Sequence, residues 1–149
     1  MDARNVVKRL LIAYPDIMPE VRELNQKLNE IKDLQLSDTV RAVTPQKAKS
    51  GPTNKTSDPT GDLVARYEAE ARRYVDRINA LLDQKRDTEH MLAQLEPVER
   101  RIVELRYINN PPYRCDIWAW IGGQVHYSRA QVKNIHNRAL DKMAKWYKT

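Results

Sequence analysis

Residues 116–143 read DIWAWIGGQVHYSRAQVKNIHNRALDKM in one-letter code, and this stretch decides the fold of the C-terminal third of the chain. It begins with a short apolar segment, residues 116–121, which the pair Gly122-Gly123 closes. Ser128 then stands where an N-cap is expected, ahead of a helix with apolar residues at helical spacing. A short helix, a glycine turn and a capped helix together predict a helix-turn-helix.

A further helix is expected before this pair, over residues 97–108. Pro97 suits the first turn of a helix, and Asn109-Asn110-Pro111-Pro112 ends it. One face of this helix is apolar and consists of Val98, Ile102, Leu105 and Ile108. The last helix buries a face that includes Ala139 and Met143. The predicted core of the three helices consists of Leu105, Trp118, Ile121, Val132, Ile135 and Leu140.

The N-terminal turns of the last helix carry polar side chains on the face turned away from this core. In a helix-turn-helix, such residues reach the edges of bases in the major groove. Arginine suits guanine, asparagine and glutamine suit adenine, and alanine fits against a thymine methyl group. The expected base-reading residues are Arg129, Ala130, Gln131, Lys133, Asn134 and Asn137. The expected phosphate contacts are Ser128, Arg114, Arg138, Lys142 and Lys145.

The charge distribution points to the same part of the chain. The net charge is +6, and residues 1–96 hold 16 basic and 16 acidic residues. Residues 97–149 hold 10 basic and 4 acidic residues, so the whole excess lies there. Because phosphates attract a localised positive excess, double-stranded DNA is the expected partner. The alternative is that the charge only keeps the protein soluble.

The remaining sequence predicts an extended all-α molecule. It has no Phe and four Gly, and charged residues make up 31% of the chain, which favours long amphipathic helices over a thick globular core. We expect an N-terminal helical segment over residues 1–36, interrupted at Tyr14-Pro15, and a flexible linker over residues 37–59. A long coiled-coil-like helix over residues 60–95 and a helix-turn-helix domain over residues 96–149 should follow.

Both upstream helices carry an apolar seam at the three-four spacing of a coiled coil. The first seam consists of Ile17, Val21, Leu24, Leu28 and Ile31. The second consists of Ala71, Tyr74, Ile78, Leu81, Leu92 and Leu95, with Lys85 and Thr88 as interruptions. The long helix packs either on the first helix of the same chain or on a second copy, as a homodimer, and the sequence leaves both alternatives open.

Several classes of function are not expected. Cys115 is the only cysteine, and no apolar run is long enough for a leader or a membrane helix, so a cytoplasmic protein is predicted. Cys115, His126 and His136 lack the fourth ligand and the paired spacing of a structural zinc site. No catalytic constellation or phosphate-cradling loop is found, so we expect no enzyme, no cofactor, no metal and no small-molecule substrate.

Three groups of residues in the C-terminal third form a recognisable pattern. They are Leu95-x-Pro97-x-Glu99-Arg100-x-Ile102-x-x-Leu105-Arg106-Tyr107, then Trp118-x-x-Ile121, then Tyr127-Ser128-Arg129-x-x-Val132-x-x-Ile135-x-x-x-Ala139-Leu140. Together they resemble region four of bacterial sigma factors, which reads the −35 promoter element. The resemblance implies base reading by Arg129, Ala130, Lys133 and Asn134. It departs from sigma factors at Ala130, where an acidic residue is common, and upstream, where the other promoter-binding regions are absent.

The wider arrangement, including Ser57-Asp58-Pro59-Thr60 before a long helix, resembles the small phage late-transcription regulators of the ArpU and RinA group. This resemblance implies a phage or prophage activator of late genes that works with RNA polymerase in the bacterial host cell. Trp120 and Trp146 are candidate contacts for polymerase or for a second subunit. The alternatives are a repressor and a small terminase-like packaging component, because small terminase subunits also join a helix-turn-helix to an oligomerising helical segment.

Overall fold

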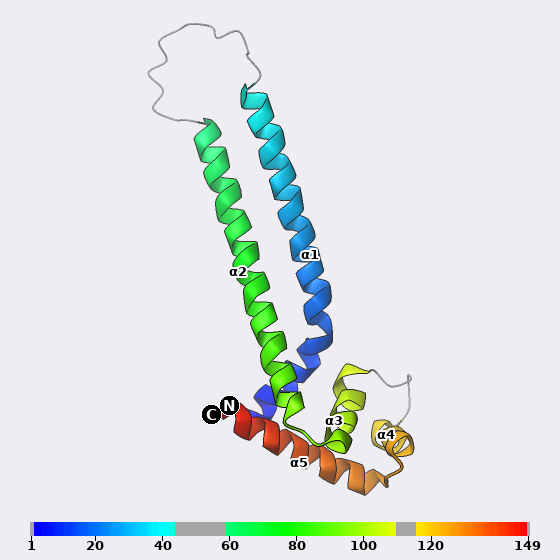
Figure 1. The fold of residues 1–149 in the computed structure, drawn as a ribbon. Coiled ribbons are helices and arrows are strands. Elements are labelled where there is room, and N and C mark those ends of the chain that lie inside the picture. The colour runs from blue at the N-terminus through cyan, green and yellow to red at the C-terminus, as the bar shows by residue number, and fades with distance from the viewer. Residues whose placement is uncertain (1, 44–58, 110–115, 149) are drawn as a thin grey trace, which may run out of the picture. The chain divides into compact units, whose positions relative to one another are not determined.

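The computed structural model describes residues 2–43, 59–109 and 116–148, and every regular element in these ranges is helical (Figure 1). The elements are α1 (Ala3–Val43), α2 (Pro59–Ala93), α3 (Pro97–Val103), a π-helical turn η1 (Glu104–Ile108), α4 (Ile117–Val125) and α5 (Arg129–Lys148). The predicted all-α fold is confirmed over the described part of the chain.

The chain forms two compact units whose boundaries differ from the predicted segments. The hairpin unit comprises Pro19–Leu81, and the globular unit combines Met1–Met18 with Leu82–Thr149. The first turns of α1 thus belong with the C-terminal helices and not with a separate N-terminal segment of residues 1–36. The physical reason is burial, because Val7 and Leu11 of α1 are fully buried in a cluster that includes residues of α5.

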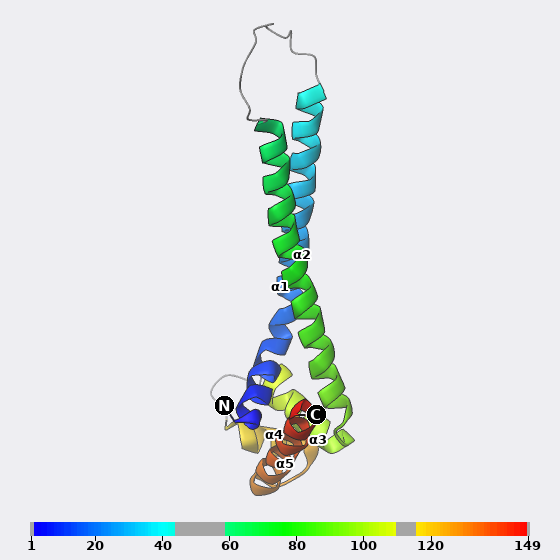
Figure 2. The same ribbon diagram turned by 90° about the vertical axis from the view of Figure 1, so that its left-hand side faces the viewer.

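In the hairpin unit, α1 and α2 run antiparallel and side by side (Figures 1 and 2). The carboxylate of Glu20 lies 3.1 Å from the guanidinium of Arg77, and the ammonium of Lys27 lies 6.0 Å from the ring centroid of Tyr74. One chain alone buries the seam residues Val21, Leu24, Ile31, Ile78 and Leu81. Of the two packing alternatives, the pairing within one chain is therefore the one found in the described residues.

Helix α1 is longer and less interrupted than predicted. It passes through Pro15 and Pro19 without a break, so the predicted interruption at Tyr14-Pro15 is wrong. A proline inside a helix costs about 3 kcal/mol, but Leu11 and Ile17 are both buried on either side of Pro15, and their packing offsets that cost. The helix also extends to Val43, into the predicted linker, because no Pro or Gly occurs between Pro19 and Val43. The rest of that linker, residues 44–58, lies outside the described residues.

The globular unit contains two clusters of buried apolar residues. The α4–α5 cluster consists of Ile102, Leu105, Ile121 and Val132, with Ile117, Trp118, Trp120, Val125 and Ile135 packed around it. The anchor cluster consists of Val7, Leu11, Met91, Leu92, Leu95, Val103, Tyr107, Ala139, Leu140 and Met143. Of the six predicted core residues, Leu105, Ile121 and Val132 belong to the α4–α5 cluster, and Trp118 and Ile135 are half-buried around it. The sixth, Leu140, is buried in the anchor cluster.

The predicted face of residues 97–108 needs one correction. Val98 is exposed, and Glu99 takes the buried position in the first turn of α3. Glu99 is held there because its Oε1 accepts a hydrogen bond from the Glu96 N–H and forms an ion pair with the ammonium of Lys142. The helix ends in the π-helical turn η1, closed by the Asn109 N–H donating to the Glu104 carbonyl at 2.7 Å, and this turn places Tyr107 in the core.

Candidate nucleic-acid interface

The turn between α4 and α5 lies later than predicted. Gly122 and Gly123 are both inside α4, and the chain reverses at His126, the residue with left-handed backbone angles (φ 63°, ψ 39°). The Gly122 carbonyl accepts hydrogen bonds from the His126 and Tyr127 N–H groups. A Cβ on Gly122 would lie 2.6 Å from the Tyr127 carbonyl oxygen, so glycine is required there for close backbone approach and not for a turn.

Ser128 caps α5 as predicted. Its Oγ accepts a hydrogen bond from the Gln131 N–H at 3.2 Å, and the Gln131 side-chain oxygen accepts one from the Ser128 N–H at 3.0 Å. This reciprocal pair is a capping box, which fixes the start of the helix. The side chain of Gln131, predicted to read a base, is therefore engaged in holding the helix end.

Asp116 ties the starts of α4 and α5 together. Its Oδ1 accepts hydrogen bonds from the Trp118 and Ala119 N–H groups, and its Oδ2 lies 2.9 Å from Nε of Arg129. Partial burial alone would raise the pKa of Asp116, but the Ala119 N–H and the Arg129 guanidinium outweigh it and lower the pKa. The contact uses only Nε of Arg129, and the two terminal nitrogens of the guanidinium are the pair that a guanine edge would take.

The predicted base readers, together with the predicted phosphate contact Arg138, fall into two rows along α5, because residues three and four apart are neighbours on a helix. The first row is Arg129, Lys133 and Asn137. The second is Gln131, Asn134 and Arg138, which with Tyr127 and Ile135 line a shallow hollow of about 240 Å³. Ala130 lies between the rows and is exposed. Tyr127, which sequence reasoning did not assign to the site, thus belongs to the same surface.

The predicted phosphate contacts are not equally available. Arg138 is exposed, whereas Nζ of Lys142 lies 2.7 Å from Oε1 of the buried Glu99. Lys142 is therefore committed to an internal ion pair, which the sequence did not predict. Lys145 lines a separate hollow together with Arg4 and Asp141, and Arg114 lies outside the described residues.

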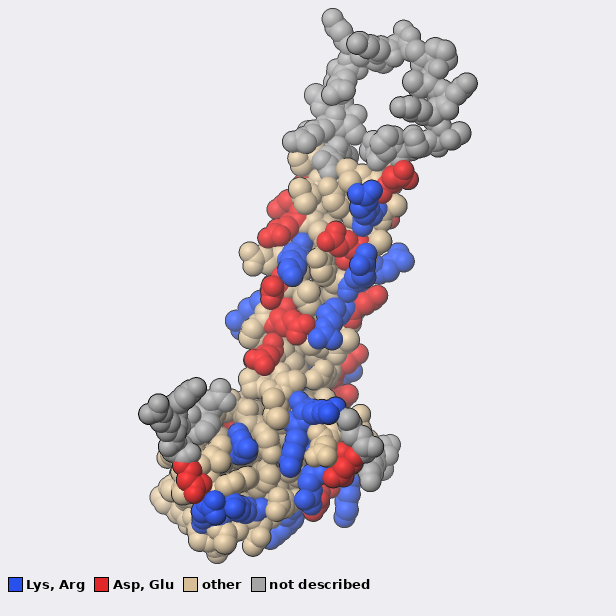
Figure 3. Space-filling view, turned by 180° about the vertical axis from the view of Figure 1, so that it is seen from behind, with Lys and Arg blue, Asp and Glu red and all other residues tan. Residues whose placement is uncertain are grey.

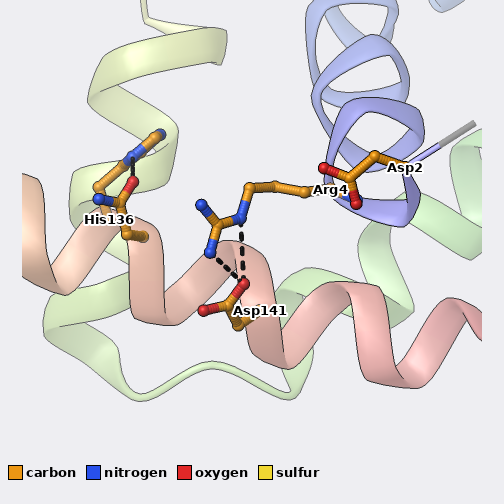
Figure 4. Close-up of polar contacts among 5 residues, drawn as sticks. Asp2, Arg4, His136 and Asp141 are labelled. Atoms are coloured by element: carbon orange, nitrogen blue, oxygen red, sulfur yellow. Dashed lines mark hydrogen bonds and ion pairs between the residues drawn. The ribbon is translucent and has the colours of Figure 1, made fainter.

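The first turns of α1 add basic residues beside the first row, and sequence reasoning missed them. Nε of Arg4 donates to Oδ1 of Asp141 at 3.0 Å, which joins α1 to the exposed face of α5 (Figure 4). Arg4 and Lys8 are close enough to His136 to lower its pKa. The available signal was the spacing of Ala3, Val7 and Leu11, which places three apolar residues on one helix face.

His136 is buried under the first row. Its Nε2 lies 2.8 Å from the Tyr107 hydroxyl, its ring centroid lies 4.8 Å from that of Trp118, and its Nδ1 lies 3.3 Å from Oδ1 of Asn137. Burial lowers the pKa of His136 to about 4, and the positive charge of Arg106 adds to this effect, whereas the Asn137 contact opposes it. The imidazole is therefore neutral at physiological pH.

The three tryptophans of the chain all pack against the buried clusters of the globular unit. Trp118 and Trp120 are half-buried against the α4–α5 cluster, and Trp146 packs against the anchor cluster and lies edge-on to His90 at 6.2 Å. Among the described side chains, no three His, Cys, Asp or Glu residues are grouped closely enough to hold a metal ion. Cys115 of the rejected zinc set lies outside those residues.

The two units differ in charge. The hairpin unit holds 11 basic and 10 acidic residues, and Figure 3 shows both signs interspersed along it. The globular unit holds 15 basic and 10 acidic residues, so it carries most of the net positive charge. The excess therefore belongs to the unit that contains α5 and its exposed polar rows.

Comparisons with family models, curated proteins and solved structures found no match to this chain. The likeness to sigma region four and to the late-transcription regulators thus rests on the residues quoted above. Within the described ranges, no helix combines the length and the apolar character that crossing a membrane requires.

Proposed function

We propose that the protein binds double-stranded DNA by inserting the N-terminal half of α5 into the major groove, and that it is a sequence-specific transcription regulator. The observation that carries the proposal is the start of α5. A capping box fixes it, α4 packs behind it, and Ala130, Asn134 and Asn137 are exposed on it. This is the arrangement by which recognition helices present short polar side chains to base edges.

The proposed contacts follow from the polar groups that each exposed side chain can offer to DNA. The side chain of Asn134 is exposed, so its amide is available for a paired contact with adenine. Arg129, held through Nε by Asp116, offers its terminal nitrogens to guanine. Arg138 is exposed beside Asn134 and suits a phosphate, which orients the protein without specifying sequence.

The biological role that we propose is activation of phage or prophage late genes together with host RNA polymerase. Its support is the pattern shared with sigma region four and with the ArpU and RinA group. The positive excess of the globular unit is consistent with a DNA partner. The alternative, a packaging role, would require a higher assembly of many copies, which the oligomeric state in solution would reveal.

The proposal is tested by selecting binding sites from random double-stranded DNA with the full chain and then measuring affinity for selected and scrambled sites. Asn134→Ala should reduce discrimination by about 1–3 kcal/mol, whereas Arg138→Ala should weaken binding to both sites alike and lower the salt dependence. Equal losses on both sites for Asn134→Ala would contradict base reading by α5. Sedimentation of the same sample as a ring of many copies would favour packaging over transcription.

A further inference from the structure

The hydrogen bonds around His136 determine which of its nitrogens carries the proton. Oδ1 of Asn137 is an acceptor, so Nδ1 of His136, 3.3 Å away, must donate to it. A neutral imidazole has one N–H, and Nε2 is therefore an acceptor. The Tyr107 hydroxyl, 2.8 Å from Nε2, supplies the matching donor. The chain of bonds thus runs from Tyr107 through His136 to Asn137.

This series of hydrogen bonds also fixes the orientation of the Asn137 side-chain amide. Its oxygen accepts from a side chain that is only 4% exposed, while Asn137 itself is exposed on the first row of α5. With Oδ1 turned toward His136, the NH₂ group is the part left for a ligand. A free asparagine reads adenine with one donor and one acceptor, and Asn137 in this state has donors to offer but no outward acceptor.

We propose that Tyr107 and His136 are positioning residues that hold the Asn137 amide with its NH₂ group toward DNA, so that Asn137 selects a keto base. This inference rests on the proposed DNA binding by α5. The keto oxygens O6 of guanine and O4 of thymine accept hydrogen bonds in the major groove, whereas adenine and cytosine present amino groups at the corresponding place. Adenine also has an acceptor at N7, so the proposal requires the NH₂ group of Asn137 to face the keto or amino position of the base and not N7. Asn137 and Asn134 therefore read opposite kinds of base, although they are the same residue type.

Removing the Tyr107 hydroxyl takes away the donor that holds this series of hydrogen bonds in one direction, without removing any residue from the interface. In Tyr107→Phe, Nε2 of His136 loses its donor, so the proton can move to Nε2 and leave Nδ1 as an acceptor. The Asn137 amide can then donate to Nδ1 and turn its oxygen outward. The variant should consequently accept an amino base where the unaltered protein selects a keto base.

The first experiment needs no DNA. Nitrogen NMR of the ¹⁵N-labelled full chain distinguishes the protonated from the unprotonated imidazole nitrogen of His136, with the exposed His90 and His126 as internal references. We expect the proton on Nδ1 in the unaltered protein and a shift toward Nε2 in Tyr107→Phe. A proton on Nε2 in the unaltered protein would overturn the inference, whatever the chain does with DNA.

The second experiment compares base preferences from site selection. Asn137→Ala should abolish the preference at one position of the site, and Tyr107→Phe should shift that same position toward adenine or cytosine by at least about fivefold. Tyr14→Phe is the matched control, because it removes a hydroxyl hydrogen bond of 2.8 Å to Glu89 elsewhere in the globular unit. It should leave every position unchanged.

The outcomes separate the two proposals. Specific binding by the unaltered chain, combined with an unchanged profile or a uniform loss of affinity in Tyr107→Phe, would overturn this inference and leave the proposed function standing. Absence of any sequence preference in the unaltered chain would overturn both.

Discussion

The α4–α5 cluster and the anchor cluster both pack against α5, but they are assembled from different distances along the chain. The first draws on residues between Ile102 and Ile135. The second joins Val7 and Leu11 of α1 to the end of α2 and to Leu140 and Met143 of α5. The half of α5 proposed to meet DNA is thus held by near neighbours in sequence, and the other half is held by the start of the chain. Packing between residues close in sequence thus shapes the proposed DNA-reading surface, and packing against the start of α1 holds the other end of α5 in place.

The largest expected effects come from replacing one buried side chain in each cluster with alanine, which tests whether both clusters hold the fold. Leu11→Ala and Ile121→Ala should each lower the free energy of unfolding by about 3 kcal/mol, since both side chains are fully buried. Ile12→Ala is the matched control, because its side chain is 61% exposed, and it should cost less than about 0.5 kcal/mol. Urea denaturation followed by tryptophan fluorescence measures all three. A cost below about 1 kcal/mol for Leu11→Ala would mean that the anchor cluster is only an accessory to the fold.

Lowering the pH should reduce the stability of the protein through His136, which lies between the two clusters. Its ring contacts Tyr107 of the anchor cluster and Trp118, which packs around the α4–α5 cluster. Its pKa in the folded protein is about 4 against an ordinary value of 6.5, so the unfolded chain binds the proton more readily. The stability is therefore complete above about pH 6.5 and is lost as the pH falls toward 4, by about 3 kcal/mol.

The variant His136→Gln does not titrate in this range and isolates that contribution from those of the carboxylates. Between pH 7 and 4, the unfolding free energy of the unaltered protein should fall by about 3 kcal/mol more than that of the variant. Equal pH dependence in the two proteins would show that His136 is not held neutral.

The ion pair between Lys142 and Glu99 provides a test of how α5 is attached to α3. Lys142→Ala leaves the buried Glu99 carboxylate without its ammonium, and we expect a loss of about 2 kcal/mol in stability, moderated because Lys142 is 40% exposed. Adding Glu99→Gln should recover most of that loss in thermal denaturation. No recovery in the double variant would mean that Lys142 acts through packing and not through its charge.

The smallest expected effect is at the start of α5. Ser128→Ala removes the hydroxyl that accepts from the Gln131 N–H and should cost about 1 kcal/mol of stability. Ser128→Asp should keep most of that stability, because a carboxylate caps a helix as well, but it should weaken DNA binding by repelling phosphate. Calorimetry and a binding titration on the same pair of variants would separate these effects. DNA affinity unchanged in Ser128→Asp would place the phosphates away from this helix end.

The sequence predicted those parts of the fold that depend on nearby residues. The Ser128 cap, the burial of Ile121 and Val132 and the all-α class follow from local spacing, and the structure confirms them. It could not predict that α1 joins the globular unit, because nothing in its local pattern says which distant surface covers Val7 and Leu11. The turn was misplaced for a related reason, since Gly122 is required by the approach of the Tyr127 carbonyl.

The candidate site shows the same limit. Spacing on a helix identified the exposed residues of α5, but pairing partners decide which of them are available. The partners of Arg129, Lys142 and Asn137 are Asp116, Glu99 and His136, and each lies on a different part of the chain or beneath the surface. Base reading by α5 itself stays a prediction.

The measurement that tests the central claim most directly is a footprint of the full chain on the complete genome that encodes it, in near-physiological salt, alongside Asn134→Ala. The account predicts one or a few protected sites ahead of a late operon, and loss of that protection in the variant at the same protein concentration. Uniform weak coverage of the genome, or protection that Asn134→Ala leaves intact, would contradict the claim that the N-terminal half of α5 reads DNA sequence.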